Sequence, residues 1–270
     1  MDKATILGLL LAGAALIGGQ LLEGGSLGMI LQATAMLIVF GGTFGAIFIS
    51  FPRHQLLQAW QEFHQIFREP KDEGPAYLAR IIEFAYRGRR EGLLSLEKEL
   101  ARLNDAFFRR GMQLVIDGHN PQKVREVMEV ELAQLEESGS APARVFDTAG
   151  GYAPTIGILG AVLGLIQVMQ NLNDPAKLGA GVAVAFVATV YGVASANLLF
   201  LPIGHKLRLR HQRRMLVKEM IMSGVLALAH GDHPRLIEEK LRGFLGEGPL
   251  ATKAERGRVR KMPPRAAGRG

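Results

Sequence analysis

The hydrophobic residues of this chain are gathered into four long blocks, separated by stretches in which polar and apolar positions mix. A helix needs about 20 residues to cross the roughly 30 Å hydrocarbon core of a bilayer, and it satisfies its own backbone there. Four blocks reach that length: residues 5–22, 28–51, 151–170 and 182–203. The pattern predicts an all-α integral membrane protein with four transmembrane helices, paired within residues 1–51 and 150–203.

The stretch between the second and third spans, residues 52–149, has helical periodicity. Its first buried helix face is predicted at Leu78, Ile81, Ile82 and Ala85. Two glycines in RGRREG, residues 87–92, favour a break or a tight turn. The helical pattern then resumes and runs on toward residues 117–118, through four leucines: Leu93, Leu96, Leu100 and Leu103.

Several residues predict where the polar helices begin and end. Asn120 is a good N-cap, and Pro121 fits a first helical turn, where its missing N–H costs nothing. The segment SGSAP, residues 138–142, is expected to be a linker leading back to the membrane. The helix of the fourth span is expected to continue into the tail, where residues 232–234 open a last amphipathic helix. Residues 52–149 and 204–246 are thus predicted to form one compact helical subdomain.

Lysine and arginine residues predict the orientation. Residues 52–149 hold 14 of them and residues 204–270 hold 16, against one each in residues 1–51 and 150–203. Because positive residues remain on the cytoplasmic side, we expect a cytoplasmic subdomain and both termini inside. The short turns at residues 22–26 and 171–181 would then face outward. A cleaved signal peptide is a poor alternative for the first span, since only Lys3 precedes it and no cleavage motif is evident.

The end of the chain is strongly basic. Residues 204–270 contain 16 basic against 6 acidic residues, and residues 247–270 have almost no large apolar side chains. We therefore expect residues 247–270 to be a disordered basic tail. Beside a membrane, such a tail favours anionic lipid over nucleic acid as its partner.

The sequence lacks the motifs of an enzyme. Without cysteine there is no disulfide or thiolate site, and neither a phosphate-binding GxxxxGK[ST], a strand-borne GxGxxG nor a metal-binding HExxH occurs. The histidines do not have the i, i+4 spacing of a helical metal pair. We expect no catalytic residue, cofactor or metal.

The third and fourth spans contain no ionisable Asp, Glu, Lys, Arg or His, yet they carry softer polar groups. An ion crossing hydrocarbon needs an ionisable or oxygen-rich station, so a partner helix would have to bring a carboxylate. Gly157, Gly160 and Gly164 place small residues on one face, and we expect the partner to pack against the small faces of both spans. As alternatives, the Thr189 hydroxyl bonds back to its own helix, and the prolines only mark helix ends or kinks.

Several motifs, in the same order, resemble the A subunit of the bacterial flagellar stator, the MotA/PomA family. They are MDKATILGLLLA and GMILQATAMLIVFGGTFGA at the start, RGRREGLLSLEKE and LVIDGH in the loop, and APTIGILGAVLGLI and VAVAFVATVYGVASANLLFLPI in the last two spans. The similarity runs from Met1 to about Gly246.

The resemblance implies a multi-pass protein of the bacterial inner membrane, in which five A subunits form a ring around two B subunits. Each single-span, peptidoglycan-binding B subunit would contribute a transmembrane Asp. Protonation or sodium binding at that Asp would be linked to rotation of the ring, whose cytoplasmic part pushes on the switch-complex protein of the rotor. The alternative is an ExbB/TolQ-like proton-driven energiser, but those relatives have three spans and lack a segment like RREGLLSLE.

The resemblance also implies site residues. The charged rotor-facing residues of the family match Arg89, Arg90 and Glu97 in RREGLLSLE. If this segment were one helix, Arg90 and Glu97 would share a face. A solvated charged turn is the alternative interpretation.

In the spans, the functional prolines of the family match Pro154 and Pro202, and its hydroxyl near the ion site matches Thr189. Sodium-driven members tend to have threonines where this chain has Ala161 and Ala188. The loss of two oxygen ligands would weaken a sodium site more than a proton site. H⁺ is therefore expected as the coupling ion in preference to Na⁺.

Overall fold

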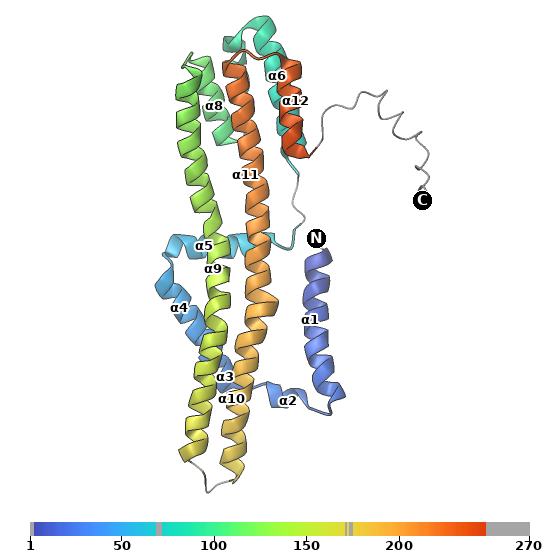
Figure 1. Cartoon of the computed structure of the whole chain (residues 1–270), viewed down its shortest axis with the longest axis vertical. Helices are drawn as coiled ribbons and strands as arrows, with labels where there is room; N and C mark the ends of the chain where they lie inside the picture. Colours follow the sequence, from blue (N-terminus) through green and yellow to red (C-terminus); the bar gives the residue numbers. More distant parts are fainter. Residues whose placement is uncertain (1–2, 69–71, 171, 173–174, 247–270) are drawn as a thin grey trace, which may run out of the picture. The chain divides into compact units, whose positions relative to one another are not determined.

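A computed structural model describes residues 3–68, 72–170, 172 and 175–246, and the predicted basic tail lies outside these residues. The secondary structure of the described residues is entirely helical (Figure 1). Four of their helices are long and apolar enough to span a membrane, which confirms the predicted fold class. The chain divides into two compact units: unit 1 contains the described residues of 1–70 and 136–212, and unit 2 contains those of 71–135 and 213–270.

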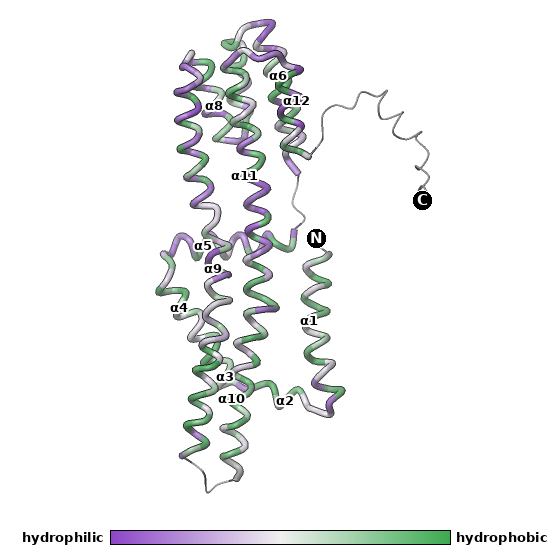
Figure 2. Tube along the Cα trace, in the orientation of Figure 1, coloured by the Kyte–Doolittle hydropathy of each residue, from purple (hydrophilic) through white to green (hydrophobic). Residues whose placement is uncertain are grey.

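Unit 1 holds the membrane spans. Its elements are α1 (Lys3–Leu22), α2 (Leu27–Ile30), α3 (Ala33–Met36), the π-helical turn η1 (Leu37–Gly41), α4 (Gly42–Ser50), α5 (Arg53–Gln65), the later part of α9 (Pro121–Gln170), α10 (Pro175–Ser195), the π-helical turn η3 (Ala196–Phe200) and the start of α11 (Leu201–Ala229). Hydrophobic residues dominate α1, α4, α10 and the adjoining part of α9 (Figure 2).

The second span is shorter than the sequence predicts. Its helix covers only Ala33–Ser50, formed by α3, η1 and α4, and extended backbone at Leu31 and Gln32 separates it from the short helix α2. The expectation of one helix over residues 28–51 was wrong because hydropathy records only the apolar character of a segment. A break inside an apolar segment survives where other protein groups satisfy the freed backbone.

The predicted linker at residues 138–142 is also wrong, because α9 runs through it without interruption. Pro142 cannot donate the hydrogen bond that Ser138 O would accept in a regular helix. Instead, Gln58 of α5 donates through Nε2 to Ser138 O at 3.3 Å. A side chain from another helix thus replaces the missing backbone donor, which a proline in the sequence does not reveal.

The helix α5 crosses α9 and α11 (Figure 1) and is attached to both. Ile66, just past its end, is buried in a cluster with Ala143 of α9 and Leu207 of α11. Arg210 donates to Gln65 O at 2.5 Å and to Ile66 O at 2.9 Å, which satisfies carbonyls that a helix end leaves without partners. Packing and polar bonds together therefore hold α5 on the polar flank of the spans.

Unit 2 is a helical subdomain built from parts of the loop and of the tail. It contains α6 (Gly74–Glu91), the 3₁₀ turn η2 (Leu93–Leu96), α7 (Glu97–Leu100), α8 (Ala106–Ile116), the first part of α9, the end of α11, α12 (Pro234–Arg242) and the 3₁₀ turn η4 (Gly243–Leu245). Fully buried side chains from several of these helices form one core, among them Ile81, Phe84, Phe108, Met112, Met220, Ile221 and Leu241. Each such side chain contributes about 1.5–3 kcal/mol by leaving water.

The helix boundaries of unit 2 follow the predicted signals in part. Asn120 Oδ1 accepts from Gln122 N at 2.8 Å, which confirms the N-cap of α9. The helix α6 continues through Gly88, and the predicted break falls at Gly92, whose φ of 83° favours glycine. The predicted continuous helix toward residues 117–118 is wrong, because α7 ends at Leu100 and α8 begins after Asp105.

Candidate functional site

The third and fourth spans pack closely through small residues. A Cβ on Gly157 would lie 2.9 Å from Ala188 O, and a Cβ on Gly164 would lie 2.9 Å from Ala185 N. The small faces are therefore filled by each other, and the expectation that a partner helix packs against them was wrong. Because lipid supplies no hydrophobic drive for helix association, close packing of small residues is what holds such a pair together.

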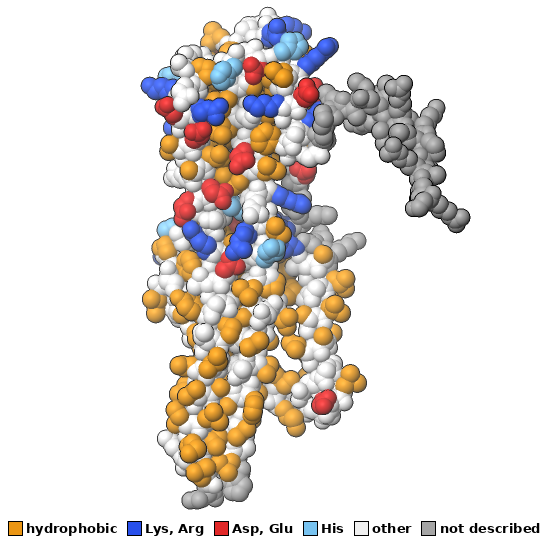
Figure 3. Space-filling model, in the orientation of Figure 1, with side chains coloured by type: hydrophobic (Ala, Val, Ile, Leu, Met, Phe, Trp, Pro, Cys, Tyr) orange, Lys and Arg blue, Asp and Glu red, His pale blue; other side chains and the backbone are white. Residues whose placement is uncertain are grey.

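The larger apolar side chains of these spans point away from the seam. The most exposed on α9 and α10 include Ile158, Leu159, Phe186, Val190 and Val193, each between 47% and 71% exposed. Figure 3 shows hydrophobic side chains covering this part of the molecule with no charge among them. This face, rather than the glycine face, is open to lipid or to a partner.

Four of the predicted site residues lie on facing turns of α9 and α10. Ala188 is fully buried in the seam, and a Cβ on Gly160, next to the half-buried Ala161, would lie 2.9 Å from its Cβ. Thr189 is half-buried, and its Oγ1 donates to Ala185 O at 3.1 Å. Pro154 lies inside α9, near the point where Gly192 comes closest.

Pro202 lies apart from this group. It is exposed at the second position of α11, directly after the π-helical turn η3. Thirteen residues separate it from Thr189, or about 20 Å of helix. The N–H of Leu201 bonds to Ala196 O, five residues back. The wider turn before a proline marks a local irregularity of the helix.

Most soft polar groups of these spans bond within their own helices. Thr155 donates to Tyr152 O at 2.8 Å, Ser195 to Gly192 O at 3.2 Å, and Asn197 to Val193 O at 2.9 Å. Their donors are thus satisfied, while their oxygens keep acceptor capacity. Residues 151–170 and 178–204 contain no ionisable Asp, Glu, Lys, Arg or His, so the described spans hold no group that takes up a proton by itself.

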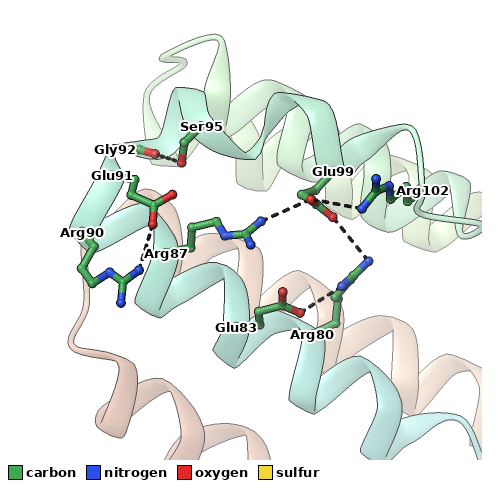
Figure 4. Close-up of polar contacts among 9 residues, drawn as sticks. All are labelled: Arg80, Glu83, Arg87, Arg90, Glu91, Gly92, Ser95, Glu99 and Arg102. Carbon is green, nitrogen blue, oxygen red and sulfur yellow. Dashed lines mark hydrogen bonds and ion pairs between the residues drawn. The ribbon is translucent and has the colours of Figure 1, made fainter.

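The charged segment of unit 2 is a turn between two helices (Figure 4). The helix α6 ends at Glu91, and the positive φ at Gly92 redirects the chain into η2 and α7. Arg90 and Glu97 therefore belong to different helices, and the shared face of a single helix does not exist. Ser95 Oγ donates to Gly92 O at 2.7 Å and closes the turn.

Glu99 is the hub of an ionic network that sequence reasoning missed. Its carboxylate lies 3.3 Å from Arg87, 3.5 Å from Arg102 and 3.8 Å from Arg80 (Figure 4). Its side chain is only 17% exposed, so the network ties α7 to α6. Arg80 and Arg87 are seven residues apart and therefore lie on the same face of α6. This spacing could have indicated an acidic partner packed against that face.

The predicted rotor-facing residues lie outside this network. Arg90 is 79% exposed and pairs with its neighbour Glu91 at 2.9 Å. Arg89 and Glu97 are exposed, and neither has an ion pair within 4.0 Å among the described residues. The turn thus exposes both signs of charge beside α6 and α7, which the Glu99 network holds together.

A second ionic site, at Asp105, stabilises unit 2. Asp105 caps α8 by accepting from Phe108 N at 2.9 Å, and it also accepts from Tyr77 at 3.2 Å and from Lys218. Burial by itself would raise the pKa of Asp105, but the bonds from Lys218 and Phe108 outweigh it and hold the pKa below its usual value. Burial, followed by the charge of Asp105, raises the pKa of Tyr77 to about 12.

Comparison with known proteins places the chain in one family. The profile of the MotA/TolQ/ExbB proton channel family matches residues 99–220, and that of the motility protein A N-terminal region matches residues 6–89. The chain is 34% identical to motility protein A of Bacillus subtilis, covering 95% of this chain and 96% of that protein. It is 36% identical to chemotaxis protein PomA of Vibrio alginolyticus, covering 93% and 98%.

Solved structures agree with these relatives. The structure of C. jejuni MotAB has a TM-score of 0.83 at 33% identity, covering 90% of this chain and 96% of that one. The flagellar MotAB stator complex from Bacillus subtilis has a TM-score of 0.80 at 33% identity, covering 96% and 99%. The chain therefore belongs to the MotA/PomA family and is a membrane-embedded stator subunit of the flagellar motor.

Proposed function

We propose that this stator subunit couples the flow of H⁺ to rotation against the rotor, together with a B subunit that supplies the transmembrane carboxylate. The observation that carries the proposal is the absence of any ionisable Asp, Glu, Lys, Arg or His from residues 151–170 and 178–204. Isolated charge in hydrocarbon is expensive, so these spans require a partner. The names of the two MotAB structures support such a partner.

The partner helix would lie along the open face of α10. Val182, Phe186, Val193 and Asn197 follow one another at helical spacing on exposed positions, and the half-buried Thr189 lies among them. A B-subunit helix on this stripe would bring its carboxylate to the Thr189 hydroxyl. The oxygen of Thr189 retains acceptor capacity for a protonated acid, because its donor is used by Ala185 O.

The preference for H⁺ rests on Ala161 and Ala188. Neither side chain offers an oxygen, and Ala188 is fully buried in the seam. The absence of two oxygen ligands weakens a sodium site more than a proton site. Swimming speed should therefore be independent of external Na⁺ at fixed pH and should fall when a protonophore is added. Motility that tracks external Na⁺ at fixed pH would refute H⁺ coupling.

The chain alone should not conduct ions. Purified without its B subunit and placed in liposomes, it should pass no selective current, whereas the complex with the B subunit should conduct. Deletion of the chain should leave flagella assembled but paralysed, unlike the loss of an ExbB/TolQ-like energiser. We further propose a ring of five such chains in the bacterial inner membrane, with both termini in the cytoplasm, as the lysine and arginine distribution favours.

The turn around Gly92 is proposed to contact the rotor through Arg89, Arg90 and Glu97. Exposed charges of this kind steer and orient a partner more than they add affinity. Combining Arg90→Glu with Glu97→Lys should impair swimming under high load while the amount of protein in the membrane stays unchanged. The control reverses another exposed pair of unit 2, Arg125→Glu with Glu129→Lys, whose atoms lie 3.5 Å apart within α9. Normal speed of the first double variant under load would remove the rotor assignment.

A further inference from the structure

The break between α2 and the second span leaves specific backbone groups to be satisfied. Leu31 N still donates to Leu27 O, and Met36 N donates to Gln32 O. The extended backbone of Leu31 (φ −84°, ψ 92°) and Gln32 (φ −121°, ψ 112°) removes the helical partners of the Gln32 N–H and the Ile30 carbonyl. These groups lie directly before the apolar helix Ala33–Ser50, and a buried backbone group without a partner destabilises the fold.

One side chain forms hydrogen bonds with both groups. The hydroxyl of Tyr191, from α10, donates to Ile30 O at 2.5 Å and accepts from Gln32 N at 3.3 Å. A phenol can do this because it is both a donor and an acceptor. The break and the tyrosine are 159 residues or more apart in sequence, so only the fold brings them together.

The position of Tyr191 gives this bond a consequence for the ion pathway. Its ring packs beside the buried cluster of Ala35 and Val39 and lies 6.2 Å from the Phe40 ring centroid. In sequence, Tyr191 follows Thr189 by two residues and directly precedes Gly192, which is packed against α9. The same turn of α10 is thus held on one side by the glycine seam and on another by the second span.

We propose that Tyr191 is a positioning residue, whose hydroxyl latches the start of the second span onto α10 and thereby sets the rotation of the turn that carries Thr189. The latch uses the backbone of Gln32 and not its side chain. The side-chain oxygen of Gln32 is buried without a hydrogen-bond partner among the described residues. We therefore expect that the side chain of Gln32 can be replaced, whereas the hydroxyl of Tyr191 cannot. This inference rests on the stator function of the family and not on the choice of H⁺.

Hydrogen exchange of the purified stator complex, containing the chain and its B subunit, tests the latch directly. Tyr191→Phe keeps the ring but removes the acceptor of the Gln32 N–H, so exchange in the peptide spanning residues 27–36 should accelerate about ten-fold. Gln32→Leu, corrected for intrinsic rate, should leave the exchange within about two-fold. Tyr152→Phe is the matched control, because that hydroxyl lies 3.2 Å from Ser50 Oγ and touches no backbone break.

Swimming speed at equal amounts of membrane protein tests the positioning role. Tyr191→Phe should reduce the speed at least two-fold relative to Tyr152→Phe. Para-aminophenylalanine at position 191 restores the donor to Ile30 O but is a poor acceptor for the Gln32 N–H, so it should recover speed while exchange of the Gln32 N–H stays faster than in wild type. If Tyr191→Phe does not assemble, the comparison of wild type with the para-amino variant and Gln32→Leu still applies. Unchanged exchange in Tyr191→Phe would overturn the latch. Faster exchange in Tyr191→Phe together with normal swimming speed would overturn the positioning role. Loss of protection in Gln32→Leu would also overturn it.

Discussion

Gly192 in the seam between α9 and α10 allows a quantitative prediction for Gly192→Ala. The added Cβ would lie 2.5 Å from Ala153 O, 3.0 Å from Gly157 Cα and 3.2 Å from Pro154 Cα. All three atoms belong to the backbone of α9. No side-chain rotation relieves the overlap, so the two helices must move apart.

The size of the movement gives the size of the effect. Ordinary contact begins near 3.4 Å, so the carbonyl oxygen of Ala153 must retreat by about 1 Å. Overpacking of this kind costs about 1–3 kcal/mol, and the better helix propensity of alanine offsets up to about 1 kcal/mol. The separation also opens the neighbouring glycine contacts along the seam. We expect a net loss of about 2 kcal/mol.

Thermal unfolding of the purified stator complex measures this loss. Gly192→Ala should lower the melting temperature and the swimming speed at matched expression. Gly179→Ala, in the same helix α10, is the control, because no atom lies within 4 Å of its added Cβ. It should leave stability unchanged or slightly higher. A melting temperature for Gly192→Ala equal to or above that of Gly179→Ala would refute the close packing of the seam.

Three further predictions concern polar groups. Asp105→Asn should destabilise unit 2 in hydrogen exchange of the purified complex. Folding lowers the pKa of Asp105, so the stability difference between wild type and Asp105→Asn should be full above pH 3.8, the usual pKa, and should vanish as the pH falls through the lower pKa of the folded state. A stability difference that does not change with pH would contradict the charged bonds. Gln58→Leu should speed exchange around residues 138–142 about five-fold, because Ser138 O loses its donor, whereas Gln55→Leu should not. Glu99→Gln should cost about 1 kcal/mol in chemical denaturation of the complex, since three arginines lose a partly buried counter-charge, and a neutral result would show that the network contributes nothing.

The membrane spans illustrate what hydropathy can and cannot report. The four apolar segments could be located from composition alone, because the cost of exposed backbone in lipid forces a long apolar helix. Composition did not show where each apolar helix begins or whether it is interrupted. A tyrosine far away in the chain bonds to the backbone on either side of Leu31, and Gln58 bonds to Ser138 O where α9 runs unbroken through Pro142. In both places a long-range donor overrides the local signal.

The charged turn shows the same division. The alternation of Arg, Glu and Gly in RREGLLSLE indicates an exposed polar segment, and the glycines indicate a turn. The position of the break, at Gly92 rather than Gly88, and the ionic network at Glu99 are set by the tertiary structure. Glu99 lies after the turn, and only the reversal of the chain brings it back onto the arginines of α6.

By itself, the sequence determined the all-helical class, the four spans, the missing intramembrane charge and the family, because all of these depend on the identity and spacing of neighbouring residues. Only the tertiary structure decided that the glycine faces of α9 and α10 cover each other, that exposed side chains such as Phe186 and Val193 flank the half-buried Thr189, and that Tyr191 bonds to the backbone before the second span. The sequence does not show which helix a small residue packs against or which group a single hydroxyl bonds to. They acquire a partner only when the fold brings a distant helix within hydrogen-bonding or van der Waals distance.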